Sequence, residues 1–98
     1  MILEAGVNVT SGSTFDMANV TFICSEDTTG GILYESGTKG NISNSIFTGT
    51  TALGDEYLVN VYGNVNIVGS SFTGNSVKAV YYATGSSGNV NDNYFDAN

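Results

Sequence analysis

Two adjacent pairs of acidic residues are the groups in this sequence that could do chemistry: Glu26 with Asp27, and Asp55 with Glu56. Two carboxylates facing each other across a sugar can hydrolyse a glycosidic bond, and carboxylate oxygens are also ligands for Ca²⁺. Because each pair follows a phenylalanine of the repeat described below, we expect both pairs in loops on the same side of the molecule. The four acids are therefore the calcium candidates, with two solvated loops as the alternative.

The rest of the composition argues against catalysis. The chain has no histidine and only two basic residues, Lys39 and Lys78, so the base that a polysaccharide lyase needs has few candidates. We expect no enzymatic activity and no cofactor. A net charge of −7 also excludes the basic patch that nucleic acid requires, and no apolar run is long enough for insertion into a membrane.

Tyrosines are the second group with a possible role in binding. Tyr34, Tyr62, Tyr81 and Tyr82 lie in or next to short apolar runs, where an exposed aromatic stripe could stack on sugars or pack on a partner. The alternative is that they fill the core. Aligning the runs by their spacing gives two possible inner columns, which are Ile32/Leu58/Val80 and Leu33/Val59/Tyr81. If the first column is inward, Tyr34, Asn60 and Tyr82 share its face.

Three N-x-[ST] sequences are possible glycan acceptors, at Asn8, Asn19 and Asn41. Asn19 is the poorest of them because it also lies at a predicted backbone corner. Asn8 and Asn41 remain the glycosylation candidates.

These residues are positioned by a repeat. Four phenylalanines recur 25, 25 and 23 residues apart, each at the end of a similar phrase: Phe22, Phe47, Phe72 and Phe95. Three residues before each phenylalanine stands a residue type that tolerates the left-handed backbone region: Asn19, Asn44, Gly69 and Asp92. Each phrase therefore predicts two short strands joined by a sharp corner with positive φ.

Each period also contains a third apolar run followed by a glycine, so it holds three short strands. A period of about 25 residues with three strands predicts one coil of a parallel β-helix, in which residues one period apart lie above each other. We expect an all-β solenoid of about four coils. The phenylalanines should form an internal stack, and the corner side chains should bond the neighbouring coil. Residues 1–98 would form one segment, a fragment of a longer solenoid.

The repeat resembles known families. The sequences from Phe72 to Asn75 and from Phe95 to Asn98 match an F-x-x-N pattern, and the run from Gly30 to Leu33 matches the Gly-Gly-aliphatic motif that accompanies it. Together they are similar to repeats of polymorphic outer-membrane autotransporter adhesins. The I-x-N-S-x-F phrase resembles still more the β-helix repeats of adhesin-like surface proteins in methanogenic archaea and some bacteria. The resemblance implies a right-handed coil, a location at the cell surface, and a role in adhesion or cell-wall architecture.

We therefore expect a non-enzymatic, extracellular solenoid segment that serves as an adhesin stalk or adhesive module. Its partner would be a surface glycan or a protein receptor. The alternative is a filament-forming solenoid whose open coil ends stack on neighbouring copies of itself, and a fragment of a polysaccharide-active enzyme is the remote alternative.

Overall fold

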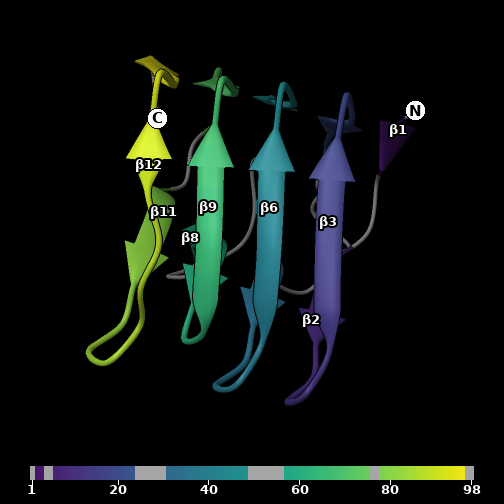
Figure 1. Ribbon diagram of the computed structural model, residues 1–98. Coiled ribbons are helices and arrows are strands. Elements are labelled where there is room, and N and C mark those ends of the chain that lie inside the picture. Colours follow the sequence, from purple (N-terminus) through teal and green to yellow (C-terminus); the bar gives the residue numbers. More distant parts are fainter. Residues whose placement is uncertain (1, 4–5, 24–30, 49–56, 76–77, 97–98) are drawn as a thin grey trace.

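The computed structural model describes residues 2–3, 6–23, 31–48, 57–75 and 78–96. Its strands form three parallel sheets, and each coil of the chain adds one strand to each sheet. In Figure 1 the strands of one sheet lie side by side. Their order follows the chain from the N-terminal to the C-terminal end of the stack. The predicted parallel β-helix of about four coils is confirmed.

Each sheet is named here after its most regular residues. The phenylalanine sheet contains β1 (Ile2–Leu3), β4 (Thr21–Phe22), β7 (Ile46–Thr48), β10 (Ser71–Thr73) and β13 (Tyr94–Asp96). The tyrosine sheet contains β2 (Val7–Val9), β5 (Ile32–Tyr34), β8 (Tyr57–Val61) and β11 (Lys78–Tyr82). The asparagine sheet contains β3 (Thr14–Ala18), β6 (Lys39–Ser43), β9 (Asn64–Val68) and β12 (Val90–Asn91). Coil 1 is β2-β3-β4, and coils 2, 3 and 4 follow in the same order.

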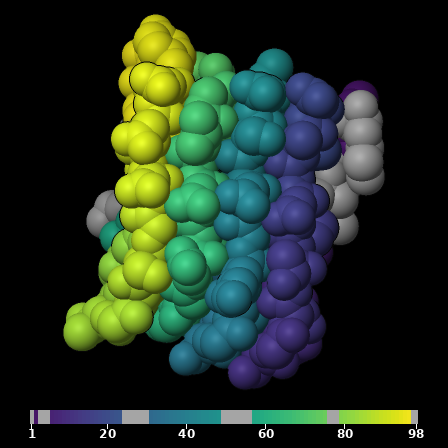
Figure 2. Space-filling model, viewed as in Figure 1, coloured from purple at the N-terminus to yellow at the C-terminus, as the bar shows by residue number. Residues whose placement is uncertain are grey.

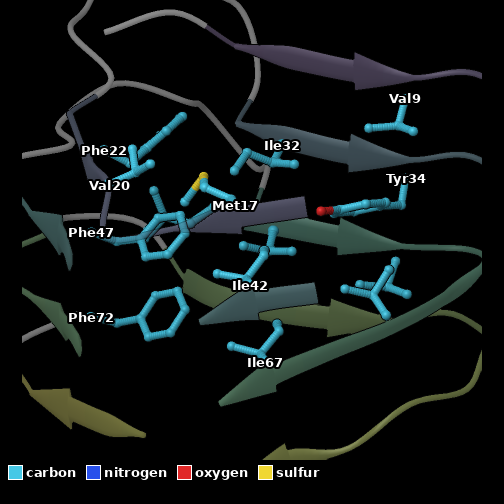
Figure 3. Close-up of a cluster of buried hydrophobic side chains, with 14 residues drawn as sticks. Val9, Met17, Val20, Phe22, Ile32, Tyr34, Ile42, Phe47, Ile67 and Phe72 are labelled. Carbon is cyan, nitrogen blue, oxygen red and sulfur yellow. The ribbon is translucent and has the colours of Figure 1, made fainter. Parts of the chain in front are cut away.

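The phenylalanine column forms as predicted at three of its four positions. Phe22, Phe47 and Phe72 are in register and have no exposed surface. Figure 3 shows Ile42 and Ile67 packed beside these rings. Phe95 continues the stack, with its ring centroid 4.9 Å from that of Phe72, but it is 47% exposed because it belongs to the last coil. The expectation that all four are internal is wrong for Phe95.

The predicted corners have the left-handed backbone conformation. φ is 58° at Asn19, 49° at Asn44, 65° at Gly69 and 56° at Asp92. The backbone N–H of the corner residue Asn44 donates to the carbonyl oxygen of Val68 at 3.1 Å, so this corner is bonded to the next coil through the main chain.

A side-chain ladder between coils lies one position after the corners, where the sequence did not predict it. The backbone N–H of Val20 donates to Ser45 Oγ at 3.3 Å, that of Ser45 donates to Ser70 Oγ at 3.1 Å, and that of Ser70 donates to Asn93 Oδ1 at 2.8 Å. Val20, Ser45 and Ser70 are buried, so these bonds satisfy backbone donors that water does not reach.

The register of the tyrosine sheet differs from both columns that the sequence offered. Ile32 pairs with Val59 rather than Leu58, and Val59 pairs with Val80. The reason lies in coil 3, where Val59 stands 12 residues after its phenylalanine, Phe47, whereas Ile32 stands 10 after Phe22. The alignment of the apolar runs therefore slips by one residue at Leu58, which is itself fully buried.

A large side chain of the tyrosine sheet packs against a glycine of the asparagine sheet. Tyr34 is fully buried, and its hydroxyl donates to the carbonyl oxygen of Phe15 at 2.9 Å. An added Cβ at Gly40 would overlap the Tyr34 ring and the Phe15 carbonyl oxygen, so glycine makes the room that the ring needs. Figure 3 shows the Tyr34 ring inside the coil, beside Val9.

The outer face of the asparagine sheet carries a second ladder. Asp16, Asn41 and Asn66 are in register, and Asn66 Nδ2 donates to Asn41 Oδ1 at 3.0 Å. The backbone N–H of Asn41 donates to Asp16 Oδ1, also at 3.0 Å. The space-filling view shows this face, where successive coils form adjacent bands (Figure 2). Its polar groups bond neighbouring coils and so contribute to stacking.

Candidate functional site

Two exposed tyrosines and one half-buried tyrosine gather at the outer side of the tyrosine sheet. Tyr81 is 39% exposed and lies in register with Leu33 and Asn60 of the preceding coils. The Tyr57 ring stacks on Tyr81, with centroids 5.1 Å apart, and the Tyr62 ring meets Tyr81 edge-on at 6.1 Å. These three residues, Tyr57, Tyr62 and Tyr81, form the tyrosine cluster, to which Tyr62 contributes the most exposed ring at 46%.

The other two tyrosine candidates face inward. Tyr34 is a core residue, and burial, followed by the negative charges of Asp16 and Tyr82, raises its hydroxyl pKa well above the usual range. Tyr82 is half-buried, and its hydroxyl donates to the carbonyl oxygen of Val65. Its pKa is also raised, by burial. Of the four predicted binding residues, the structure therefore leaves Tyr62 and Tyr81 on the surface and brings them together.

The connection between the tyrosine and asparagine sheets has an irregular length. It is four residues long in coils 1, 2 and 4, at residues 10–13, 35–38 and 83–86, but in coil 3 it consists of Tyr62 and Gly63 alone. Each long connection is a β-turn closed by a backbone hydrogen bond: Ser13 to Thr10, Thr38 to Glu35, and Ser86 to Ala83. The third residue of each is a glycine with φ of 82–89°, as a type II turn requires.

The short connection leaves a notch between two longer turns. One depression, of about 290 Å³, is bounded by the turns of coils 2 and 4 and by the short connection of coil 3. Lys39, Tyr62 and Ser87 are among the residues in its walls. A second depression, of about 350 Å³, lies between coils 2 and 3 and is lined by Leu33, Glu35, Ser36, Asn60 and Tyr62. Ser36 and Tyr62 line both depressions, so the two are adjacent parts of one surface.

The walls of the notch are held by hydrogen bonds. Thr38 Oγ1 donates to the carbonyl oxygen of Glu35 at 2.6 Å, and the backbone N–H of Asn64 donates to the carbonyl oxygen of Thr38 at 2.9 Å. A Cβ at Gly63 would overlap the carbonyl oxygen of Thr38, so the short connection of coil 3 lies close against the turn of coil 2. On the sheet itself, Asn60 Nδ2 donates to the carbonyl oxygen of Tyr57 at 3.0 Å.

The remaining predicted sites are distributed as follows. Glu26, Asp27, Asp55 and Glu56 lie outside the described residues. Among the residues that are described, no three histidine, cysteine or acidic side chains are grouped closely enough to bind a metal ion. Of the glycosylation candidates, Asn8 is exposed in β2, while the amide of Asn41 belongs to the ladder on the asparagine sheet.

Sequence reasoning missed the notch and the part that Ser36 and Gly63 have in it. The signal lies in the spacing between inner residues, and it can be read only once the register of the tyrosine sheet is known. Tyr34 pairs with Val61, and Ile42 pairs with Ile67. Tyr34 precedes Ile42 by eight residues, but Val61 precedes Ile67 by only six, so the connection between the two sheets is two residues shorter in coil 3.

Comparison of the chain with protein-family models, with curated proteins and with solved structures found no match. In the parts of the chain that the structure describes, no helix has the length and apolar character needed to cross a membrane.

Proposed function

We propose that this chain is a non-enzymatic segment of an extracellular surface solenoid and serves as an adhesive module or stalk. Its partner is a surface glycan or a protein receptor, bound through the tyrosine cluster. The single observation that supports this most is the gathering of Tyr57, Tyr62 and Tyr81 on the outside of a regular stack whose inner positions are filled by apolar side chains. Grouped aromatic rings with polar groups beside them are typical of recognition surfaces.

The regular features of the fold need no active site to account for them. The phenylalanine column, the corners and both hydrogen-bonded ladders each stabilise the contact between coils. The tyrosine cluster, by contrast, departs from the repeat, because Tyr62 and Tyr81 align with Glu35 and Leu33 in coil 2 rather than with other aromatic residues. We infer that binding has been added to the scaffold at this place.

The test is binding of the full chain to a glycan array and to cells, with Tyr62→Ser and Tyr81→Ser compared with Tyr94→Ser. Tyr94 is a matched control because it is 58% exposed but lies in the phenylalanine sheet. We expect the first two changes to weaken binding and the control to leave it unchanged. Turnover of a polysaccharide by the purified chain, or equal binding by all three variants, would contradict the proposal.

A second candidate is assembly of copies through the open coil ends. Large apolar side chains are exposed in the last coil at Val90, Tyr94 and Phe95. Such an edge can pair with another chain. Light scattering over a wide concentration range tests this candidate, since a species that stays monomeric throughout would eliminate it.

A further inference from the structure

We propose that the notch beside Tyr62 is a binding site for an uncharged, hydroxyl-rich oligosaccharide of at least two sugar rings. This inference rests on the proposed adhesive function and specifies the ligand for the same surface. It goes beyond that function because it assigns a subsite, a ligand length and a ligand charge.

The length of the ligand follows from the two depressions. Their volumes, about 350 and 290 Å³, each lie near the lower end of the range for small-molecule sites. Because Ser36 and Tyr62 line both of them, a ligand that crosses the Tyr62 ring can occupy both at once. A single sugar ring would use one depression only, so a chain of rings should bind more tightly.

The chemical class follows from the groups around the ring. Tyr62 offers an exposed aromatic face, and the apolar face of a sugar can stack on such a ring. Glu35 supplies an acceptor in one depression, and Lys39 supplies a donor in the other. Sugar hydroxyls both donate and accept, so they can bond to either group.

The charge of the ligand follows from the same two residues. One acidic and one basic side chain on either side of Tyr62 leave the site itself without an excess of either sign. The whole chain carries a net charge of −7, which repels an acidic polysaccharide at longer range. An uncharged glycan therefore fits better than a polyuronate.

The site is also held in shape before a ligand binds. The turn of coil 2 is closed by Thr38 Oγ1 and the turn of coil 4 by Ser86 Oγ, each of which donates to a carbonyl oxygen at 2.6 Å. Gly63 lies close against Thr38 between them. Fixed walls reduce the ordering cost of binding, which favours a measurable affinity for a small ligand.

The experiment fills the notch without removing any side chain. Insertion of Ser-Gly between Tyr62 and Gly63 gives coil 3 the four-residue turn of coils 2 and 4, with glycine at the third position. Titration calorimetry then compares the full chain, this insertion variant, Tyr62→Ser and the control Tyr94→Ser. The probes are cellotetraose, chitotetraose, their monosaccharides, and tetragalacturonate. Circular dichroism and thermal melting verify that each variant is folded.

We expect at least one uncharged tetrasaccharide to bind, more tightly than its monosaccharide and than tetragalacturonate. The insertion and Tyr62→Ser should each weaken this binding by roughly tenfold or more, and Tyr94→Ser should not change it. Preferred binding of tetragalacturonate, or undiminished binding by a folded insertion variant, would overturn the inference. If no probe binds but the chain still adheres to cells through Tyr81, the inference fails and the proposed function stands.

Discussion

The rings of Phe47 and Phe72 lie parallel in the core of the solenoid, with centroids 4.5 Å apart and an angle of 7° between their planes. Their backbones are paired in register in neighbouring strands, so the ring stack repeats the spacing of the sheet. Each coil thus covers the apolar face of the one before it, which a single coil could not bury alone.

Replacing Phe47 with alanine should therefore destabilise the fold strongly. Phe47 is fully buried between two rings, and truncation of a buried phenylalanine costs about 3–5 kcal/mol. Urea denaturation measures the change in the free energy of unfolding. Phe95→Ala is the control, and it should cost much less because Phe95 is half exposed. Equal losses for the two variants would contradict a stack that is closed at Phe47 and open at Phe95.

Asn44→Val should also be destabilising, although Asn44 is exposed. Its φ of 49° is strained for a β-branched residue, at a cost of about 1–3 kcal/mol. Asn44→Gly keeps access to positive φ and should have little effect. Thermal melting separates the two outcomes, since a valine variant that melts like the wild type would mean that this corner is not left-handed.

Ser70→Ala removes the acceptor for the buried N–H of Ser45. A buried donor left without a partner costs about 1–3 kcal/mol, so the loss should exceed that of an ordinary surface change. Ser71→Ala, one position further, is the control, because Ser71 is half-buried in β10 and its side chain is outside the ladder. If both changes are equally mild in chemical denaturation, the ladder contributes little to the contact between coils.

Tyr34 should make stability fall in alkaline solution. Its raised pKa means that the folded protein keeps the phenolic proton after the unfolded chain, with an ordinary pKa near 10, has begun to lose it. Stability is therefore complete below pH 10 and decreases as the pH rises above it. Tyr34→Phe should reduce this decrease, leaving the smaller part due to Tyr82. An identical pH profile in the two proteins would contradict the burial of the hydroxyl.

The corners and the ring stack could be predicted from sequence because their residue types are restricted. Only asparagine, glycine and aspartate occupy the corner, and positive φ is the physical reason. Phenylalanine recurs because the buried positions of its column are equivalent in successive coils and accept a side chain of the same size. Exposure of Phe95 was not predictable from the spacing, since an end coil has the same sequence pattern as an inner one.

The register of the tyrosine sheet and the notch could not be predicted in the same way. Coil 3 has two more residues between Phe47 and Val59 than coil 2 has between Phe22 and Ile32, and two fewer in the connection that follows β8. These changes cancel in the overall period of 25 residues from Phe47 to Phe72. Because the overall period is unchanged, the spacing of the phenylalanines revealed neither the register of the tyrosine sheet nor the notch. The ladder through Ser45 and Ser70 was also hidden, because serine is common throughout this chain and marks no particular backbone geometry.

Mapping of backbone amide shifts by NMR tests the binding claim most directly. The full chain is titrated with the uncharged tetrasaccharide that binds best, and the shift of each amide signal is followed. The account predicts that the largest changes cluster at Ser36, Tyr62, Gly63 and Asn64, around the notch. Largest changes at Tyr94 and Phe95, or along the Asn41 ladder of the asparagine sheet, would contradict it.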